Sequence, residues 1–339
     1  MAINIARRKF IATLGGTALA WPLAARAQHL ARSVYRGLRT LSDLWRRSWH
    51  QLVRSVLRVI GKSLSVHVII FGEHGWDWMT ALAPHAPVWS RMYDVDKVLL
   101  IPATPGTSIP EPSRGDIRTV VIPLLEDHTR HCPRQYLSLI ADDHSIDALG
   151  NKAAFSAYAE AIGFAHLCPK TYASSADAVF PCVLKRVDLD ASRGVAIVRS
   201  SLELQSCLEQ DPWVGQAFIL QSFAAGATEY VTHCVCKDGQ ILWHCSFCYE
   251  LNSPDSIRSP VDMVRSRPAT ASQFTLSQIK EFLSPLSYCG PCNVDYKISD
   301  SGRIIVFEIN PRLGGSLMMP RNVNYLRDAL SHIIKAALD

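Results

Sequence analysis

Two carboxylates and an amide near the C-terminal end of the chain have the types and spacing that suit a divalent cation. Asp295 and Glu308 lie on two extended segments that fold back on each other in the hairpin predicted for residues 293–310. Asn310 follows Glu308 by two positions, and alternate residues of a strand share a face. Mg²⁺ binds carboxylate oxygens together with substrate phosphates. The sequence therefore predicts a magnesium site on Asp295, Glu308 and Asn310; an exposed acidic hairpin without a ligand is the alternative.

The register of this hairpin depends on its turn. We take Ser301-Gly302 as a two-residue turn, which makes Asp300 face Arg303 and brings the two predicted metal-binding carboxylates face to face. Like charges this close repel, and burying them without a partner costs on the order of several kcal/mol. A bound cation would remove that cost.

The residues after the hairpin favour an anionic substrate. Arg312 places a guanidinium beside the carboxylates, and this planar group suits an anion such as an acyl phosphate. Gly314, Gly315 and Ser316 then form a loop whose backbone N–H groups are expected to approach an oxyanion. A lone Gly-Gly-Ser is usually only a turn, so its position beside Glu308-x-Asn-x-Arg is what gives it weight.

The segment Phe307-Glu-Ile-Asn-Pro-Arg-Leu-Gly-Gly-Ser316 resembles the metal-binding strand and substrate loop of the ATP-grasp superfamily, which includes carbamoyl-phosphate synthetase, biotin carboxylase and D-alanine–D-alanine ligase. The resemblance implies that Lys152 and Lys185 contact the ATP phosphates, and that Lys185 and Arg312 act in catalysis. The implied ATP-binding residues of the closing loop, the adenine hinge and the ribose site are Ser192, Arg193, Gly194, Gln221, Ser222, Phe223 and Glu229. The implied substrate residues are Arg312, Gly314, Gly315 and Ser316.

The chain departs from the family pattern at three places. The loop around Arg193 is short and poor in glycine, and Gln221 stands where the family often has Glu. Asn293 stands where some relatives carry Arg, which affects how the substrate is oriented.

The elements that must position these residues predict an α/β fold. Residues 65–148 hold three β-rich runs, at 66–71, 97–101 and 119–123, and are expected to form a small α/β layer before the ATP-grasp domain. Residues 149–339 are expected to form a two-lobed ATP-grasp domain with antiparallel sheets. Candidate cleft residues of the first layer are Glu73, His74, Glu126, Asp127 and His128.

Residues 1–64 differ from the rest in charge. They carry twelve Lys or Arg and one acid, whereas the remainder is mildly acidic. Arg7-Arg8, the apolar stretch after them and a small-residue cleavage site resemble a twin-arginine export signal. Residues 30–60 have the apolar spacing of a basic amphipathic helix, which predicts contact with a membrane surface or a partner; packing on the body and a mis-assigned start are the alternatives.

Composition indicates a folded soluble protein without a nucleic-acid face. The hydrophobic share is 48% and the charged share 19%. Ten cysteines include Cys234-x-Cys236, Cys245-x-x-Cys248 and Cys289-x-x-Cys292, but the spacing between the pairs matches no common zinc module. Most lie in strand-like runs, where a thiol packs as a small apolar group. We expect free thiols in a reducing compartment.

The expected function is an ATP- and Mg²⁺-dependent ligase that joins a carboxylate to an amine through an acyl phosphate, with Mn²⁺ as an alternative ion. Its expected partners are small-molecule substrates and no nucleic acid; a homodimer is an option because dimers are frequent in related enzymes. The expected location is the cytoplasm, where ATP is supplied. An ATP-binding module without turnover is one alternative. An exported solute-binding protein is another and is disfavoured, because only the first 28 residues indicate it.

Overall fold

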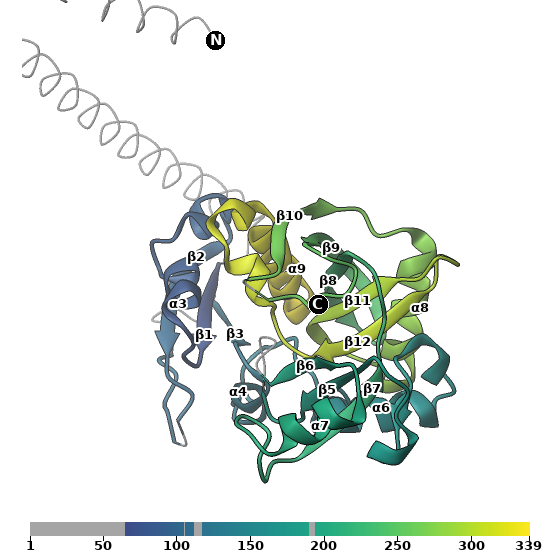
Figure 1. Ribbon diagram of the computed structural model, residues 1–339. Coiled ribbons are helices and arrows are strands. Elements are labelled where there is room, and N and C mark those ends of the chain that lie inside the picture. The colour runs from purple at the N-terminus through teal and green to yellow at the C-terminus, as the bar shows by residue number, and fades with distance from the viewer. Residues whose placement is uncertain (1–64, 105, 112–116, 190–193, 260) are drawn as a thin grey trace, which may run out of the picture. The chain divides into compact units, whose positions relative to one another are not determined.

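A computed structural model describes residues 65–104, 106–111, 117–189, 194–259 and 261–339 (Figure 1). These residues belong to one compact unit and form three sheets, which confirms the predicted mixed α/β fold. The export-like segment and the basic helix expected before residue 65 lie outside the described residues. The boundary expected between residues 148 and 149 stays a prediction. Within the described part of the chain, no helix is long and apolar enough to cross a membrane.

The first sheet is parallel, with the strand order β2-β1-β3. The apolar run Val-His-Val-Ile-Ile-Phe forms its central strand and is buried along its whole length. A helix follows each of the strands β1 and β3, which end at the same edge of the sheet (Figure 1). The elements of this layer are β1 (Val66–Phe71), α3 (Trp76–Leu82), β2 (Val95–Ile101), β3 (Arg118–Pro123) and α4 (Glu126–Arg130).

The second sheet is antiparallel, with the order β4-β7-β5-β6. One face packs on α7 through Leu184, Val198 and Leu204, and the opposite face carries Val183 and Lys185. Before it lies α6, whose first turn is capped by Asn151: its side-chain oxygen accepts from the backbone N–H groups of the second and third helical residues. The elements are α5 (Asp143–Leu149), α6 (Lys152–Ala161), β4 (Thr171–Tyr172), β5 (Cys182–Arg186), β6 (Val195–Val198), α7 (Ser201–Leu208) and β7 (Phe218–Ser222).

The third sheet has five antiparallel strands in the order β10-β9-β8-β11-β12. Its strands and the two long helices beside it are β8 (Thr228–Lys237), β9 (Gln240–Leu251), β10 (Met263–Ala269), α8 (Gln273–Leu283), β11 (Gly290–Ile298), β12 (Ile304–Asn310) and α9 (Val323–Leu338). Short 3₁₀ turns complete the chain: η1 (Pro87–Arg91), η2 (Ala165–Leu167), η3 (Ser175–Asp177), η4 (Ser284–Leu286), η5 (Gly315–Met318) and η6 (Pro320–Asn322).

The two faces of the five-stranded sheet belong to different cores. One face packs against α9 and the first layer, through residues such as Val231 and Phe247. The other packs against α5, α6 and α8, through residues such as Val294 and Ile309. We call these the site face and the core face, because the candidate functional residues of β8, β11 and β12 alternate with the buried apolar residues of the second core.

The hairpin formed by β11 and β12 corrects one prediction and confirms another. The turn is not the two-residue one expected, because Ser299 pairs with Arg303 around a three-residue loop that ends at Gly302, with φ +79°. Asp300 therefore does not face Arg303. A β-bulge opposite the step from Asp295 to Tyr296 shifts the register back. The expected pairing of Asp295 with Glu308 is present as a result.

All ten cysteines are free thiols, as expected, and seven of them are buried. Cys234, Cys236 and Cys292 pack together on the core face of the five-stranded sheet. They act there as small apolar side chains with weak mutual hydrogen bonds.

Candidate active site

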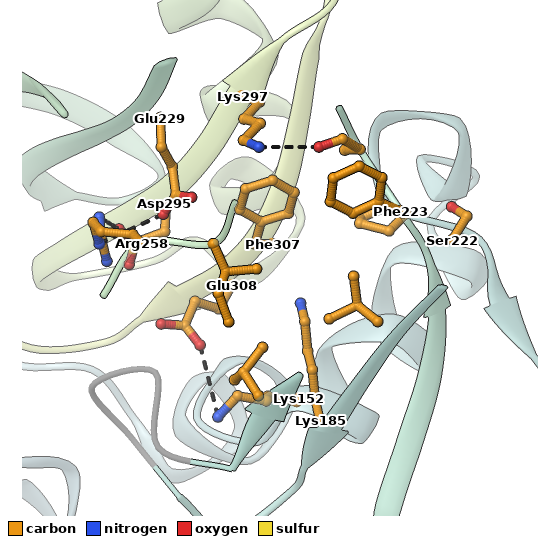
Figure 2. A pocket seen from close by; sticks show the side chains of 15 residues that line it. Lys152, Lys185, Ser222, Phe223, Glu229, Arg258, Asp295, Lys297, Phe307 and Glu308 are labelled. Carbon is orange, nitrogen blue, oxygen red and sulfur yellow. Dashed lines mark hydrogen bonds and ion pairs between the residues drawn. The ribbon is translucent and has the colours of Figure 1, made fainter. Parts of the chain in front are cut away.

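A pocket lies between the second sheet and the five-stranded sheet (Figure 2). Figure 2 shows Lys152 and Lys185 on one side, with the carboxylates of Glu229, Asp295 and Glu308 opposite them. Its lining consists of Lys152, Pro169, Val183, Lys185, Val195, Ser222, Phe223, Ala224, Glu229, Ile257, Arg258, Asp295, Lys297, Phe307 and Glu308. Its mixture of charged and apolar side chains suits a ligand that has both an anionic and an apolar part.

The bulge on β12 explains how two adjacent residues reach the same pocket. In a regular strand, Phe307 and Glu308 would point to opposite faces. The extra residue at the bulge lets both of them line the pocket. The aromatic ring of Phe307 then lies 5.3 Å from Lys185 Nζ, measured to the ring centre, so the bulge supplies an apolar wall and a carboxylate from consecutive positions.

The carboxylates of Asp295 and Glu308 have different electrostatic surroundings. Burial raises the pKa of Asp295 to about 6, with nearby Glu308 adding to the shift and Arg258 opposing it. Burial also opposes ionisation of Glu308, but Lys152 and then Lys185 outweigh it, so the pKa of Glu308 is lowered. The Nζ of Lys152 lies 3.8 Å from Glu308 Oε2.

These oxygens fit a divalent ion that arrives with a phosphate. No three His, Cys, Asp or Glu side chains in the described ranges gather closely enough to hold a metal alone. Mg²⁺ needs fewer, because it commonly takes one or two carboxylates and completes its shell with phosphate and water. Asn310 Nδ2 donates to Glu308 Oε1 and to Asn293 Oδ1, at 3.2 and 3.3 Å, which directs its amide hydrogens toward these oxygens. Asp295, Glu308 and the amide oxygen of Asn310 are therefore a suitable donor set.

The two lysines expected at the phosphates lie on two different elements, Lys185 on β5 and Lys152 on α6. Lys185 is 9% exposed, and burial lowers its pKa, with Glu308 as the largest opposing influence. Lys152 is the first residue of α6 and donates to the backbone oxygen of Leu189. Both cations thus face the carboxylates of β11 and β12 across the pocket, where phosphate oxygens are best neutralised.

Arg258 and Lys297 are charged pocket residues that the sequence did not single out, and Arg258 is the one that contacts the acids. Its Nη1 donates to Asp295 Oδ1 at 2.6 Å, its Nε lies 3.5 Å from Glu229 Oε1, and its guanidinium lies over the ring of Tyr249. It neutralises two buried acids that would otherwise repel each other. It lies in the β9–β10 loop without any motif around it, and only the fold brings it to the acids, so no sequence signal marks it.

The expected adenine hinge divides between the pocket and the protein interior. Ser222 and Phe223 line the pocket, but the Gln221 side chain turns away from it and donates to Ser156 Oγ and Thr171 Oγ1. Lys297 lies at this end and donates to the backbone oxygen of Ala224 at 3.0 Å. Any base reading at the hinge must therefore use main-chain atoms around Phe223 rather than the side chain of Gln221.

The small loop expected to close over the triphosphate is described only at its end. Ser192 and Arg193 lie outside the described residues. Gly194 has φ +61°, and its backbone oxygen accepts from Arg186 N. A Cβ at this position would lie 2.8 Å from Arg186 Cγ, so both its conformation and its contact require glycine.

Arg312 connects the segment after β12 with the first layer. Its Nε donates to Glu126 Oε1 at 3.1 Å, and its Nη1 donates to the backbone oxygen of Leu313. Of the candidate cleft residues, Glu126 is the one that contacts a predicted site residue. Glu73 and Asp127 are exposed, and His74 stacks on Trp78, with ring centres 4.4 Å apart.

His128 packs against the start of the loop after β1. A Cβ on Gly72 would lie 2.0 Å from His128 Nδ1, and Gly72 has φ +109°, so both the contact and the backbone require glycine. Burial lowers the pKa of His128. Both Gly72 and His128 thus shape the loop beside Glu126.

The predicted substrate loop rests on a buried histidine of β8. His233 Nε2 lies 2.6 Å from Ser316 Oγ, and Gly314 lies directly against the imidazole. Gly315 is exposed. No motif in the sequence marks His233, because only the fold brings it to the loop.

Comparison with solved structures finds similar proteins, whereas comparison of the whole sequence finds none. No protein-family model matches the chain, and no curated protein matches it. D-alanine–D-alanine ligase from Bacillus anthracis superposes with a TM-score of 0.53 at 13% identity, over 81% of this chain and 98% of that chain. N5-carboxyaminoimidazole ribonucleotide synthetase, in an ADP complex, gives 0.51 at 16% identity, over 75% and 72%.

A third solved structure leads to the same superfamily. L-amino acid ligase from Bacillus licheniformis gives a TM-score of 0.50 at 14% identity, over 80% of this chain and 75% of that chain. All three of these proteins are ATP-grasp ligases. The sequence-based resemblance is thereby confirmed at the level of architecture, and the chain has the fold of the ATP-grasp superfamily.

Proposed function

We propose that this protein is an ATP- and Mg²⁺-dependent ligase that joins a carboxylate to an amine through an acyl phosphate. The observation that carries the proposal is the pairing of Asp295 with Glu308 opposite Lys152 and Lys185, around one pocket. Cations on one wall and carboxylates on the other suit a triphosphate with a bound metal. The lysines would neutralise phosphate oxygens, and the carboxylates would bind the metal.

Each group has a distinct task in the first step. Lys152 and Lys185 bind phosphate oxygens, while Asp295, Glu308 and Asn310 would hold the metal. When bound, Mg²⁺ draws charge from the β- and γ-phosphates. A substrate carboxylate oxygen attacks the γ-phosphorus, and the bond from that phosphorus to the β-phosphate oxygen breaks to release ADP.

The second step takes place beside Arg312. The amine nitrogen attacks the carbonyl carbon of the acyl phosphate, phosphate leaves with the bonding electrons, and the nitrogen loses a proton. We assign the binding of the acyl phosphate to Arg312, whose guanidinium is held by Glu126. The protein contributes orientation and charge stabilisation rather than a covalent intermediate of its own.

The proposal is tested by measuring ADP release with ATP and Mg²⁺ against panels of amino acids and small carboxylic acids. We expect ADP release to rise with a specific acid, and hydroxylamine to trap the activated acyl group as a hydroxamate. Glu308→Gln should abolish both, whereas Ile309→Val, on the other face of the same strand, should retain both. Nucleotide binding without substrate-stimulated ADP release across the panels would support the binding module instead.

A further inference from the structure

His233 and Ser316 form a buried pair beneath the predicted substrate loop. His233 lies in the middle of β8, is 2% exposed, and is paired with Cys245 on β9 and Asn293 on β11. Its Nε2 is 2.6 Å from Ser316 Oγ, a short hydrogen bond between two elements far apart in sequence. The imidazole is thus fixed by the sheet and reaches one polar atom of the loop.

The predicted substrate loop packs closely against this imidazole at Gly314. A Cβ on Gly314 would lie 2.3 Å from His233 Cε1 and 3.0 Å from Asn293 Cγ. Gly314 has φ −102°, which other residues also adopt, so the glycine is required by close approach and not by an unusual backbone. The close contact of Gly314 with His233 brings the loop near enough for Ser316 to reach the imidazole.

The hydrogen bond has a definite direction. Burial, with Arg258 and Arg312 nearby, lowers the pKa of His233 to about 3, so the ring is neutral at physiological pH. Its Nδ1 is buried without a partner among the residues described. A buried N–H without an acceptor is costlier than a bare lone pair, so the proton belongs on Nε2. Ser316 Oγ then accepts from His233, and its own hydrogen points elsewhere.

The hydroxyl hydrogen of Ser316 is then available to a second acceptor. Tyr249 is a hydrogen-bond neighbour of Ser316, but a phenol oxygen is a weaker acceptor than an anionic oxygen. Arg312, four residues earlier in the predicted substrate loop, carries a guanidinium that donates to Glu126 and to the backbone oxygen of Leu313. A substrate bearing a carboxylate or acyl-phosphate oxygen would be the better partner for both groups.

We propose that His233 is a positioning residue, which holds the Ser316 hydroxyl as a hydrogen-bond donor toward an anionic oxygen of the substrate. This inference rests on the proposed ligase function for its substrate and on the geometry alone for its hydrogen bond. The two parts can be tested separately.

The hydrogen bond is tested without turnover, by nitrogen-15 NMR of the histidine rings in the full chain, with His233→Gln used to assign the signal. We expect a neutral ring at pH 7 that carries its proton on Nε2. In Ser316→Ala the Nε2 proton should lose its hydrogen-bonded shift. An Nδ1–H tautomer or an imidazolium at pH 7 would overturn the inference, whether or not the protein is a ligase.

The positioning role is tested by a double-mutant cycle on the substrate that stimulates ADP release. Loss of a hydrogen bond to a charged group should raise the KM of the carboxylate substrate about tenfold in both His233→Leu and Ser316→Ala. The double variant should be no worse than either single variant. His233→Gln, which retains an N–H near the position of Nε2, should recover most of the loss.

Nucleotide affinity provides the control for a folding defect. It should stay unchanged in all of these variants, because neither residue lines the nucleotide pocket. Additive KM effects, or an unchanged KM in Ser316→Ala, would overturn the positioning role. Failure of the proposed function would look different, since the wild-type chain would then show no stimulated ADP release at all.

Discussion

The two faces of the five-stranded sheet use the same strands for opposite purposes. On the site face, charged side chains such as Asp295 and Glu308 are stabilised by specific cations. On the core face, Val294 and Ile309 are fully buried among apolar neighbours from three helices. Adjacent residues of one strand therefore serve different ends: one set carries the charges of the candidate site, and the other stabilises the fold. Substitutions at neighbouring positions should separate the two properties.

The largest effect is expected from Glu308→Gln. The amide cannot supply a charged oxygen for the metal or pair with Lys152, so kcat should fall about a thousandfold. The free energy of unfolding should change little, because Glu308 is half-buried and close to solvent. Steady-state ADP release and urea denaturation measure the two quantities. A variant that retains near-normal turnover would contradict the role of the carboxylate.

Arg258→Leu should chiefly affect stability, although it lies on the site face. It leaves the buried carboxylates of Asp295 and Glu229 without their cation, which should lower the free energy of unfolding by about 3–5 kcal/mol. Added Mg²⁺ should recover part of this loss. Arg265→Leu, which removes an exposed arginine paired with Glu250, is the matched control and should cost little. Equal effects of the two variants in urea denaturation would contradict the neutralising role of Arg258.

A pH-dependent effect of intermediate size is expected at His233. Its folded pKa, about 3, is below its ordinary value of 6.5, so the unfolded chain binds its proton first. The stability contributed by the neutral ring is complete above pH 6.5 and is lost as the pH falls toward 3, by about 2 kcal/mol at pH 5. His233→Gln should lack this loss. The free energy of unfolding is measured at about pH 7 and about pH 5, on either side of the ordinary pKa of histidine. An equal change in both proteins would contradict the role of the buried neutral ring.

The smallest effect is expected from Ile309→Val on the core face. Removing one buried methylene group should cost about 0.5–1.5 kcal/mol of stability. The kcat and KM values should match those of the wild type, although Ile309 lies between Glu308 and Asn310. A kinetic defect larger than the stability defect would show that the two faces are coupled.

The sequence predicted the pairing of Asp295 with Glu308, but for a reason that is partly wrong. Asp295 and Glu308 do face each other, yet the expected two-residue turn is absent and a bulge at Phe307 restores the register. Two local deviations cancel, and a regular hairpin pattern contains neither of them. The strand at residues 66–71 was predicted with the observed bounds, because it is a short apolar run next to glycine.

Residues positioned by tertiary contacts could not be predicted from the sequence. Arg258 reaches the acids from a loop, and His233 reaches Ser316 across 83 residues of chain. Neither lies in a motif, because their partners are set by the fold and not by spacing. The edge strand β10 was also missed, since its run from Met263 to Ala269 contains two arginines and a proline and lacks the apolar alternation of a buried strand.

The most direct test of the central claim is calorimetric titration of ADP with and without Mg²⁺. The claim is that paired carboxylates on the site face bind a metal that binds the nucleotide. We expect Mg²⁺ to tighten ADP binding at least about tenfold in the wild type and in Ile309→Val. The Mg²⁺ effect should vanish when Asp295→Asn and Glu308→Gln are combined. Equal ADP affinity with and without Mg²⁺ in the wild-type chain would contradict the claim.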